Sequence, residues 1–199
     1  MGSIDGSKAL VKSYGPERDC LLVESRGKQK FAAINEALPK ASGNYIYILE
    51  PGDRFSTTDS LGKITAASQK SKLTLLSYRN SSSGELTQFN KEQFVSEKSY
   101  LLAEEFPLCS LFWSKAYLIE AGAFDESYML CAQKKLLAQA QKSLSAKDLT
   151  VVSEGLVNRD AGNLSYLHQY SWIKVKESRR AVLSLLSRLC IMFKMRLAK

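Results

Sequence analysis

The pattern of apolar and polar positions predicts alternating helices and strands. Apolar residues at three- and four-residue spacing predict amphipathic helices over residues 28–41, 114–121 and 131–144, and a further helix ending at Gln69. Short apolar runs rich in β-branched and aromatic residues predict strands over residues 20–24, 45–50, 72–78 and 149–153, with an extended stretch at 108–113. The β-α-β order at the beginning of this series is typical of an α/β domain.

The most informative stretch is residues 31–55, where an amphipathic helix leads into a continuous apolar run at 45–49. A strand covered on both faces has such a run, and ligands of α/β folds gather just beyond the carboxyl ends of the strands. Glu50 and Asp53 stand at that end, which predicts a phosphate or metal site. The alternative is that Pro51, Gly52 and Asp53 form an ordinary β-turn and that Glu50 is merely solvated.

Three separated segments resemble the inverting family 2 glycosyltransferases of the GT-A fold, especially the bacterial members that build surface polysaccharides. Residues 2–7, with Asp5, look like the family's "DGSTDGS" turn, and residues 112–126 look like its "F-r-r…G-G-F-D-E" segment. Residues 33–53 are similar to its "A-x-N-x-G…L-D-x-D-D" run. A weaker likeness covers residues 152–165, so the resemblance extends over residues 1–165.

The resemblance implies a GT-A-like, mostly parallel sheet flanked by helices over residues 1–165. It implies transfer of a sugar from a nucleotide-sugar donor to a glycan or lipid-linked acceptor in the synthesis of cell-surface polysaccharide. The donor site would include Asp5, Asn35, Glu50 and Asp53, and the last two would hold Mg²⁺ or Mn²⁺. Such an ion takes one or two protein carboxylates and neutralises the charge on the departing diphosphate. Asn35 is otherwise a polar residue on a helix surface.

The sequence departs from the family pattern at the positions that matter for chemistry. Glu50 replaces an Asp, and Gly52 occupies the second acidic place. Gln133 falls where the family places its catalytic base, and glutamine accepts no proton at neutral pH. Asp125 and Glu126 are the nearest carboxylates, although residues in such a place commonly cap the turn before a helix. The catalytic base is therefore unassigned.

The family also has a strand-helix-strand unit before its "DGSTDGS" turn, whereas Met1 stands inside that turn here. We therefore expect an N-terminally truncated transferase, whether a fragment, a mis-called start, half of a split enzyme or a decayed copy. Two functions follow from this expectation. The chain is either a glycosyltransferase, or a noncatalytic remnant or partner subunit that binds membrane or another transferase.

Composition agrees with one such domain and places the charge at its end. The chain has 199 residues, 45% of them hydrophobic, and a formal net charge of +8. Eight of the 28 basic residues but only one of the 20 acidic residues lie from Tyr170 onward, so the body is close to neutral. The charge therefore says nothing about a pocket in the body.

The basic tail, residues 166–199, predicts an amphipathic helix, because apolar residues from Val182 to Leu197 recur at helical spacing. Residues 174–199 could bind an anionic bilayer or pack on the domain itself. Nucleic acid is not predicted, because Trp172 and Phe193 do not interleave with the basic residues. The four scattered cysteines and the polar amino terminus predict a cytoplasmic protein, peripheral on the inner membrane face if the tail binds there.

Overall fold

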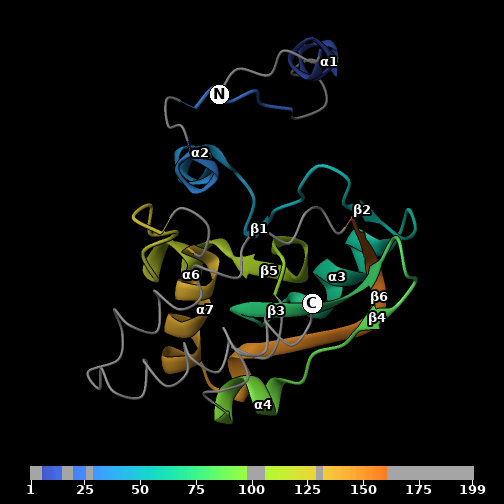
Figure 1. Cartoon of the computed structure of the whole chain (residues 1–199). Helices are drawn as coiled ribbons and strands as arrows, with labels where there is room; N and C mark the ends of the chain where they lie inside the picture. Colours follow the sequence, from blue (N-terminus) through green and yellow to red (C-terminus); the bar gives the residue numbers. More distant parts are fainter. Residues whose placement is uncertain (1–5, 15–19, 26–28, 98–105, 129–131, 161–199) are drawn as a thin grey trace, which may run out of the picture.

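The computed structural model of the chain describes residues 6–14, 20–25, 29–97, 106–128 and 132–160 (Figure 1). Asp5 and the tail at 166–199 lie outside these residues. The helices are α1 (Ser7–Tyr14), α2 (Lys30–Ala37), α3 (Ser60–Ser68), α4 (Lys91–Ser96), α6 (Lys115–Glu120) and α7 (Ala132–Ser143). The strands are β1 (Tyr45–Tyr47), β2 (Arg54–Phe55), β3 (Leu73–Asn80), β4 (Leu86–Thr87), β5 (Leu111–Ser114) and β6 (Leu149–Arg159).

The strands form one mixed sheet with the order β1-β5-β3-β6-β2, and β4 pairs with β3. Only β3 and β6 are parallel, while the other four pairings of the described strands are antiparallel. The prediction of a mostly parallel sheet was therefore wrong in this part of the chain. Two of these antiparallel pairings come from β5, which runs between β1 and β3 in the opposite direction to both, and the others come from the short strands β2 and β4.

The core forms around β3, whose first six residues are all buried. Its neighbours β5 and β6 cover both of its edges. Large side chains from β5, the helices and the loops complete the cluster, the largest fully buried ones being Trp113, Phe31, Phe94, Phe106 and Phe124. A strand that is buried throughout reads as a continuous apolar run, which is why the sequence predicted it well.

The predicted strand over residues 45–50 is β1, but it lies at the margin of the sheet. It has three residues, each half-buried, and among the described strands it pairs with β5 alone. The carbonyl of Asn44 accepts from the Lys115 amide at 2.9 Å, so Asn44 and Lys115 are a hydrogen-bonded pair of the ladder. Such pairs alternate along an antiparallel ladder, so the backbone groups of Tyr45 and Tyr47 point away from β5, toward the outer edge of β1. The expectation of a strand buried on both faces and between neighbours was therefore wrong.

The four helices predicted in the body, before residue 145, are present as α2, α3, α6 and α7, and their ends have local causes. The Ser114 side chain caps α6 by accepting from the Tyr117 amide, and the helix ends before Gly122, which has a φ of +85°. The expected strand at 20–24 is wrong, because these residues form no strand. They are tied to α1 by an ion pair between Lys8 and Glu24, 2.5 Å long.

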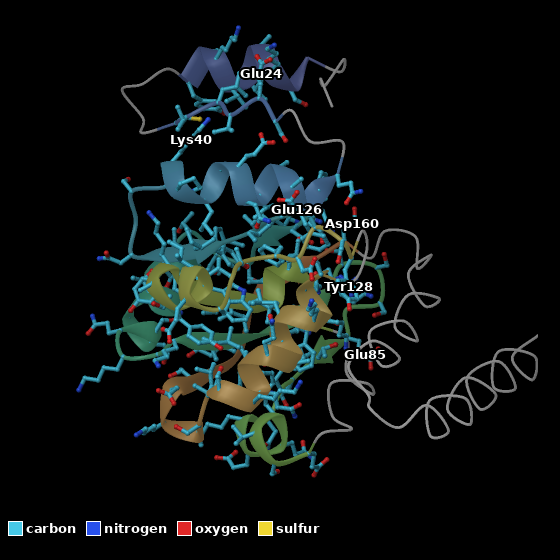
Figure 2. The ribbon with its side chains drawn as sticks, turned by 90° about the vertical axis from the view of Figure 1, so that its left-hand side faces the viewer. Glu24, Lys40, Glu85, Glu126, Tyr128 and Asp160 are labelled. Carbon is cyan, nitrogen blue, oxygen red and sulfur yellow. The ribbon has the colours of Figure 1, made fainter. Side chains whose placement is uncertain are left out.

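Figures 1 and 2 both show α1 beyond α2, on the side away from the sheet. None of its eight residues is buried. Among the residues that the structure describes, no helix is both long and apolar enough to cross a bilayer.

The buried strand β3 should dominate stability. We expect Leu75→Ala to lower the free energy of unfolding by about 2–5 kcal/mol, because Leu75 is fully buried and its loss leaves a cavity. Leu61→Ala is the matched control, since Leu61 is 46% exposed on α3. Urea denaturation followed by circular dichroism measures both variants, and equal effects would contradict this assignment of the core.

Candidate functional site

The candidate site lies where β1 ends, in a tight turn formed by Glu50, Pro51, Gly52 and Asp53. The Asp53 amide donates to the Glu50 carbonyl at 3.0 Å, and the Glu50 amide donates to the Asp53 carboxylate at 3.0 Å. Proline in second place and a glycine with a φ of +94° in third place fit a type II turn. The predicted β-turn is therefore present, and the turn itself orients the two carboxylates.

The pairing of β2 with β6 brings a further acid to this turn. Arg54 lies opposite Asn158, so the same antiparallel register continued outward places Gly52 opposite Asp160. The approach is close, because a Cβ atom at position 52 would lie 2.6 Å from the Asp160 Oδ2 atom. An acidic side chain at position 52 has no room, and the carboxylate of Asp160 occupies the place instead.

Asp53 is half-buried, and it lies beside a floor formed by the side chains of Tyr47, Phe55 and Cys109. Tyr47 donates its hydroxyl to the Cys109 carbonyl at 2.8 Å, and its ring stacks on Phe55 with centroids 5.6 Å apart. Burial raises the pKa of Asp53, while hydrogen bonds from the backbone amides of Glu50 and Asp160 oppose the rise. Burial also raises the pKa of the Cys109 thiol, which remains protonated and donates to Asp53.

Glu50 points away from this floor toward the beginning of α2. Its carboxylate forms an ion pair with the Lys30 ammonium at 2.7 Å, and the two side chains are 36% and 42% exposed. An ion pair as exposed as this one contributes little free energy. Glu50 is thus the more accessible of the two carboxylates at the turn.

Asn35 joins helix α2 to the segment that resembles "G-G-F-D-E". Its amide nitrogen donates to the Phe124 carbonyl at 2.7 Å and to Glu126 at 3.0 Å, and its oxygen accepts from the Phe124 amide at 3.1 Å. The ring of Phe31 stacks on that of Phe124 with centroids 5.0 Å apart. Asn35 therefore fixes the 124–126 turn against α2, and its predicted contact with the donor stays a prediction.

The carboxylate of Asp125 is held in an ion pair. It accepts from the Ser127 amide at 2.9 Å and contacts the Lys135 ammonium. The hydrogen bond from Lys135 lowers the pKa of Asp125 to about 2. Because a general base works best with a pKa near the operating pH, Asp125 is poorly suited to that role. It caps the turn, which is the alternative that the sequence left open.

Gln133 stands in the first turn of α7 and donates its amide to the Phe106 carbonyl. The Gln133 side chain is half-buried, and its amide cannot act as a general base. The structure therefore brings together Glu50, Asp53 and Asp160 at one turn, and holds Gln133 on a different element. Figure 2 labels Glu126 and Asp160 on one side of the molecule and Lys40 on the opposite side.

Within the described residues, no group of three or more His, Cys, Asp or Glu side chains is arranged to hold a metal ion. Mg²⁺ bound with a nucleotide needs only one or two protein carboxylates, because phosphates and water complete its shell. Oxygen ligands of this kind are present in Glu50 and Asp53. The predicted cation at these residues stays a prediction.

Sequence reasoning missed Asp160, Lys30 and Cys109 as parts of this region. Asp160 is far from the turn in sequence and comes to it only through the β2–β6 register. Lys30 reaches Glu50 across 20 positions. No local sequence signal marks any of these contacts.

Comparison with known proteins identifies the fold. Three crystal structures of S. aureus TarS are similar to this structure: the whole protein, a 1–349 form, and the 1–349 form in complex with UDP. The TM-scores are 0.62, 0.62 and 0.56, with 14%, 14% and 15% sequence identity. No family model and no curated protein matches the sequence.

In each comparison the matched region covers 92% of this chain but only 34%, 56% and 56% of the TarS chain. The chain thus spans about a third to a half of the proteins that it resembles. At this low identity the likeness concerns architecture alone, and it shows that this chain shares the mixed α/β fold of the matched part of TarS.

The Gly52 turn yields a first test of the site. We expect Gly52→Ala to lower the free energy of unfolding by about 2–3 kcal/mol, because a positive φ is strained for alanine and the new Cβ meets Asp160. Gly84→Ala is the matched control, since Gly84 also has a positive φ but nothing within 4 Å, and about 1 kcal/mol is expected. Chemical denaturation measures both variants.

A double variant separates the two causes. Adding Asp160→Gly to Gly52→Ala should remove the contact and bring the loss down to that of Gly84→Ala. A double variant as unstable as Gly52→Ala would contradict the close approach of Asp160 to the turn.

The ion pair of Asp125 yields a prediction of pH dependence. Its pKa of about 2 lies below the unfolded value of about 3.9, so its stabilisation is present above about pH 4 and lost as pH falls toward 2. The side chain is 36% exposed, so the effect stays below about 1 kcal/mol. NMR titration should show Lys135→Gln raising the pKa of Asp125 toward 3.9, with Asp148 as an unaffected internal control.

Proposed function

We propose that this chain is the nucleotide-sugar-binding part of a glycosyltransferase with a GT-A-like architecture. The observation that carries the proposal is the fold, which matches TarS over 92% of this chain, including a TarS structure in complex with UDP. The acidic turn after β1 gives the proposal a chemical basis, because it offers oxygen ligands at the end of a strand. The donor is a nucleoside diphosphate sugar.

In this proposal Glu50 and Asp53 have different tasks. Glu50 is accessible, and its weak ion pair with Lys30 can open to let the carboxylate bind Mg²⁺ or Mn²⁺. Asp53 is half-buried and holds the turn by accepting from the Glu50 amide, and its carboxylate would supply a further oxygen ligand. A cation placed there would neutralise charge on the leaving diphosphate.

In this proposal Lys30 binds phosphate when its ion pair with Glu50 is open. Its ammonium lies 5.0 Å from the centre of the Phe31 ring and 2.7 Å from Glu50. Once Glu50 turns to the ion, Lys30 is left beside a phosphate-bearing ligand, and lysine binds phosphate as a point charge. Asn35 supports this edge of the site by fixing α2 to the 124–126 turn.

The same proposal includes an acceptor and a membrane contact. The acceptor is a glycan or lipid-linked sugar of a cell-surface polysaccharide, and residues 174–199 make the peripheral membrane contact. The resemblance of residues 112–126 to the acceptor segment of family 2 enzymes supports the acceptor class. The basic character of the tail supports the membrane contact and a place on the cytoplasmic face.

A second function is favoured by the open edge of β1 and by Gln133. Among the strands that the structure describes, β1 pairs on one edge only, and such an edge can receive a strand from another chain. That pairing would make this chain a noncatalytic partner of another transferase. Gln133 offers no base, which agrees with loss of turnover. The two candidates differ in whether the donor site still binds nucleotide.

Binding of UDP with Mn²⁺ is the deciding experiment. At a ligand concentration about 100 times the dissociation constant, the folded state gains about 2.7 kcal/mol, which raises Tm by roughly 5–10 °C in a domain of this size. We expect Glu50→Gln to remove the Mn²⁺-dependent part of this shift.

Glu92→Gln is the charge-matched control, because Glu92 is exposed in the first turn of α4, which contributes no residue to the acidic turn. It should shift with UDP and Mn²⁺ as the unmodified chain does. Absence of any shift in the unmodified chain would eliminate the donor site and leave the noncatalytic candidate.

A further inference from the structure

A broad hollow of about 520 Å³ lies at the other end of the sheet from the acidic turn. Its lining comes from residues 42–45, 69–72 and 114–116 and from Ile119. These are the segments where β1 and β3 begin and where β5 ends, so the topology gathers them at one edge. Tyr45 at the hollow and Glu50 at the acidic turn are five residue steps apart, which is roughly 16 Å at strand geometry.

The hollow is basic, although the body of the chain is nearly neutral. Its lining contains Lys70, Lys72 and Lys115 and no acidic residue. Asp148 is the carboxylate that interacts electrostatically with Lys72, and its carbonyl accepts from the Lys72 amide. The Asp148 carboxylate also accepts from the amide and hydroxyl of Ser145, at 2.9 and 2.5 Å. Three lysines beside this one carboxylate leave the hollow with a net positive charge.

Two of the three ammonium groups are held in place by their surroundings. Lys115 donates to the Ala41 carbonyl at 2.5 Å, and the Lys72 ammonium lies 5.7 Å from the centre of the Tyr117 ring. Lys70 is exposed at the rim. Charges that are positioned before binding cost less conformational entropy when a ligand arrives.

The rest of the lining suits a sugar. Ser42, Asn44 and Gln69 offer hydroxyl and amide groups for hydrogen bonds with sugar hydroxyls, and Ile119 is an exposed apolar side chain. The shape is broad and shallow, which suits a segment of a polymer more than an enclosed small molecule.

We propose that this hollow, with Lys70, Lys72 and Lys115, is a second binding site that takes an acidic sugar chain. The anionic character of the ligand follows from the lysines, whereas the choice of a sugar chain rests on the proposed function. The site would hold a charged glycan at the opposite edge of the sheet from the nucleotide. Nucleic acid is disfavoured, because Tyr45 is the sole aromatic residue of the described lining and its hydroxyl is bound to the Ser68 carbonyl at 2.9 Å.

Lysine footprinting of the full chain tests the site directly. The chain is labelled with an amine-reactive reagent, with and without an oligogalacturonide as the acidic sugar chain, and mass spectrometry reports the labelling of each lysine. We expect labelling of Lys70, Lys72 and Lys115 to fall several-fold, while Lys12 and Lys91 keep their labelling. This readout is separate for each residue, so binding by the basic tail does not obscure it.

Three outcomes would overturn the proposal. Equal protection of all lysines would show charge attraction without a site, and equal protection by a neutral maltooligosaccharide would remove the role of the lysines. Equal protection by single-stranded DNA would replace the sugar with nucleic acid. A chain that fails to bind UDP but shows the expected pattern would refute the donor site and leave this one standing.

Matched variants measure the contribution of the charges. We expect the double variant Lys70→Gln with Lys72→Gln to weaken oligogalacturonide binding by about ten-fold in fluorescence anisotropy, a change that corresponds to about 1.4 kcal/mol. Lys12→Gln with Lys91→Gln removes the same charge from α1 and α4, which do not line the hollow, and should change the affinity less than two-fold. Equal weakening by the two pairs would overturn the proposal.

Discussion

The parallel pairing of β3 with β6 is the contact on which the rest of the fold depends. β3 is buried along its first six residues, and its partner runs beside it from Leu149 to Arg159. The register slips where Leu76 pairs with Val152 but Tyr78 with Val157, so β6 bulges around Gly155. Beyond the bulge β6 also pairs with β2, and this pairing connects the centre of the sheet to the acidic turn. A bulge beside a functional loop commonly aims a side chain in this way.

This geometry separates two kinds of chemistry along the strands. Carboxylates gather where β1 and β6 end, and lysines gather where β1 and β3 begin. The acidic end combines an accessible Glu50 with a half-buried Asp53 whose pKa is raised by burial. A cation or a hydrogen-bond donor is therefore favoured beside Asp53, because it stabilises the ionised form. The basic end favours an anion instead, because lysine ammonium groups line it.

Helix α2 links the acidic end of the sheet to the segment at 112–126, which resembles the acceptor segment of family 2 enzymes. Asn35 is the link, since three hydrogen bonds of its amide hold the 124–126 turn against α2. The same helix begins at Lys30, the partner of Glu50. A movement of α2 would therefore affect the Glu50 turn and the 124–126 turn together. The open edge of β1 adds a surface where another strand can pair.

The sequence by itself determined the longer helices and strands of the body, and it singled out Glu50 and Asp53. It also predicted a strand at 20–24 that is absent, and it did not mark β2, β4 or α4. Local periodicity, the Gly122 helix stop and the Pro51-Gly52 turn chemistry act over a few residues, so these features can be predicted from the chain. Strand direction and order are set by pairings between distant segments, which is why the sheet proved mixed and β1 lay at its margin. The same long-range register brought Asp160 to Gly52. Tertiary structure alone decided those contacts, because no local signal encodes which strands become neighbours.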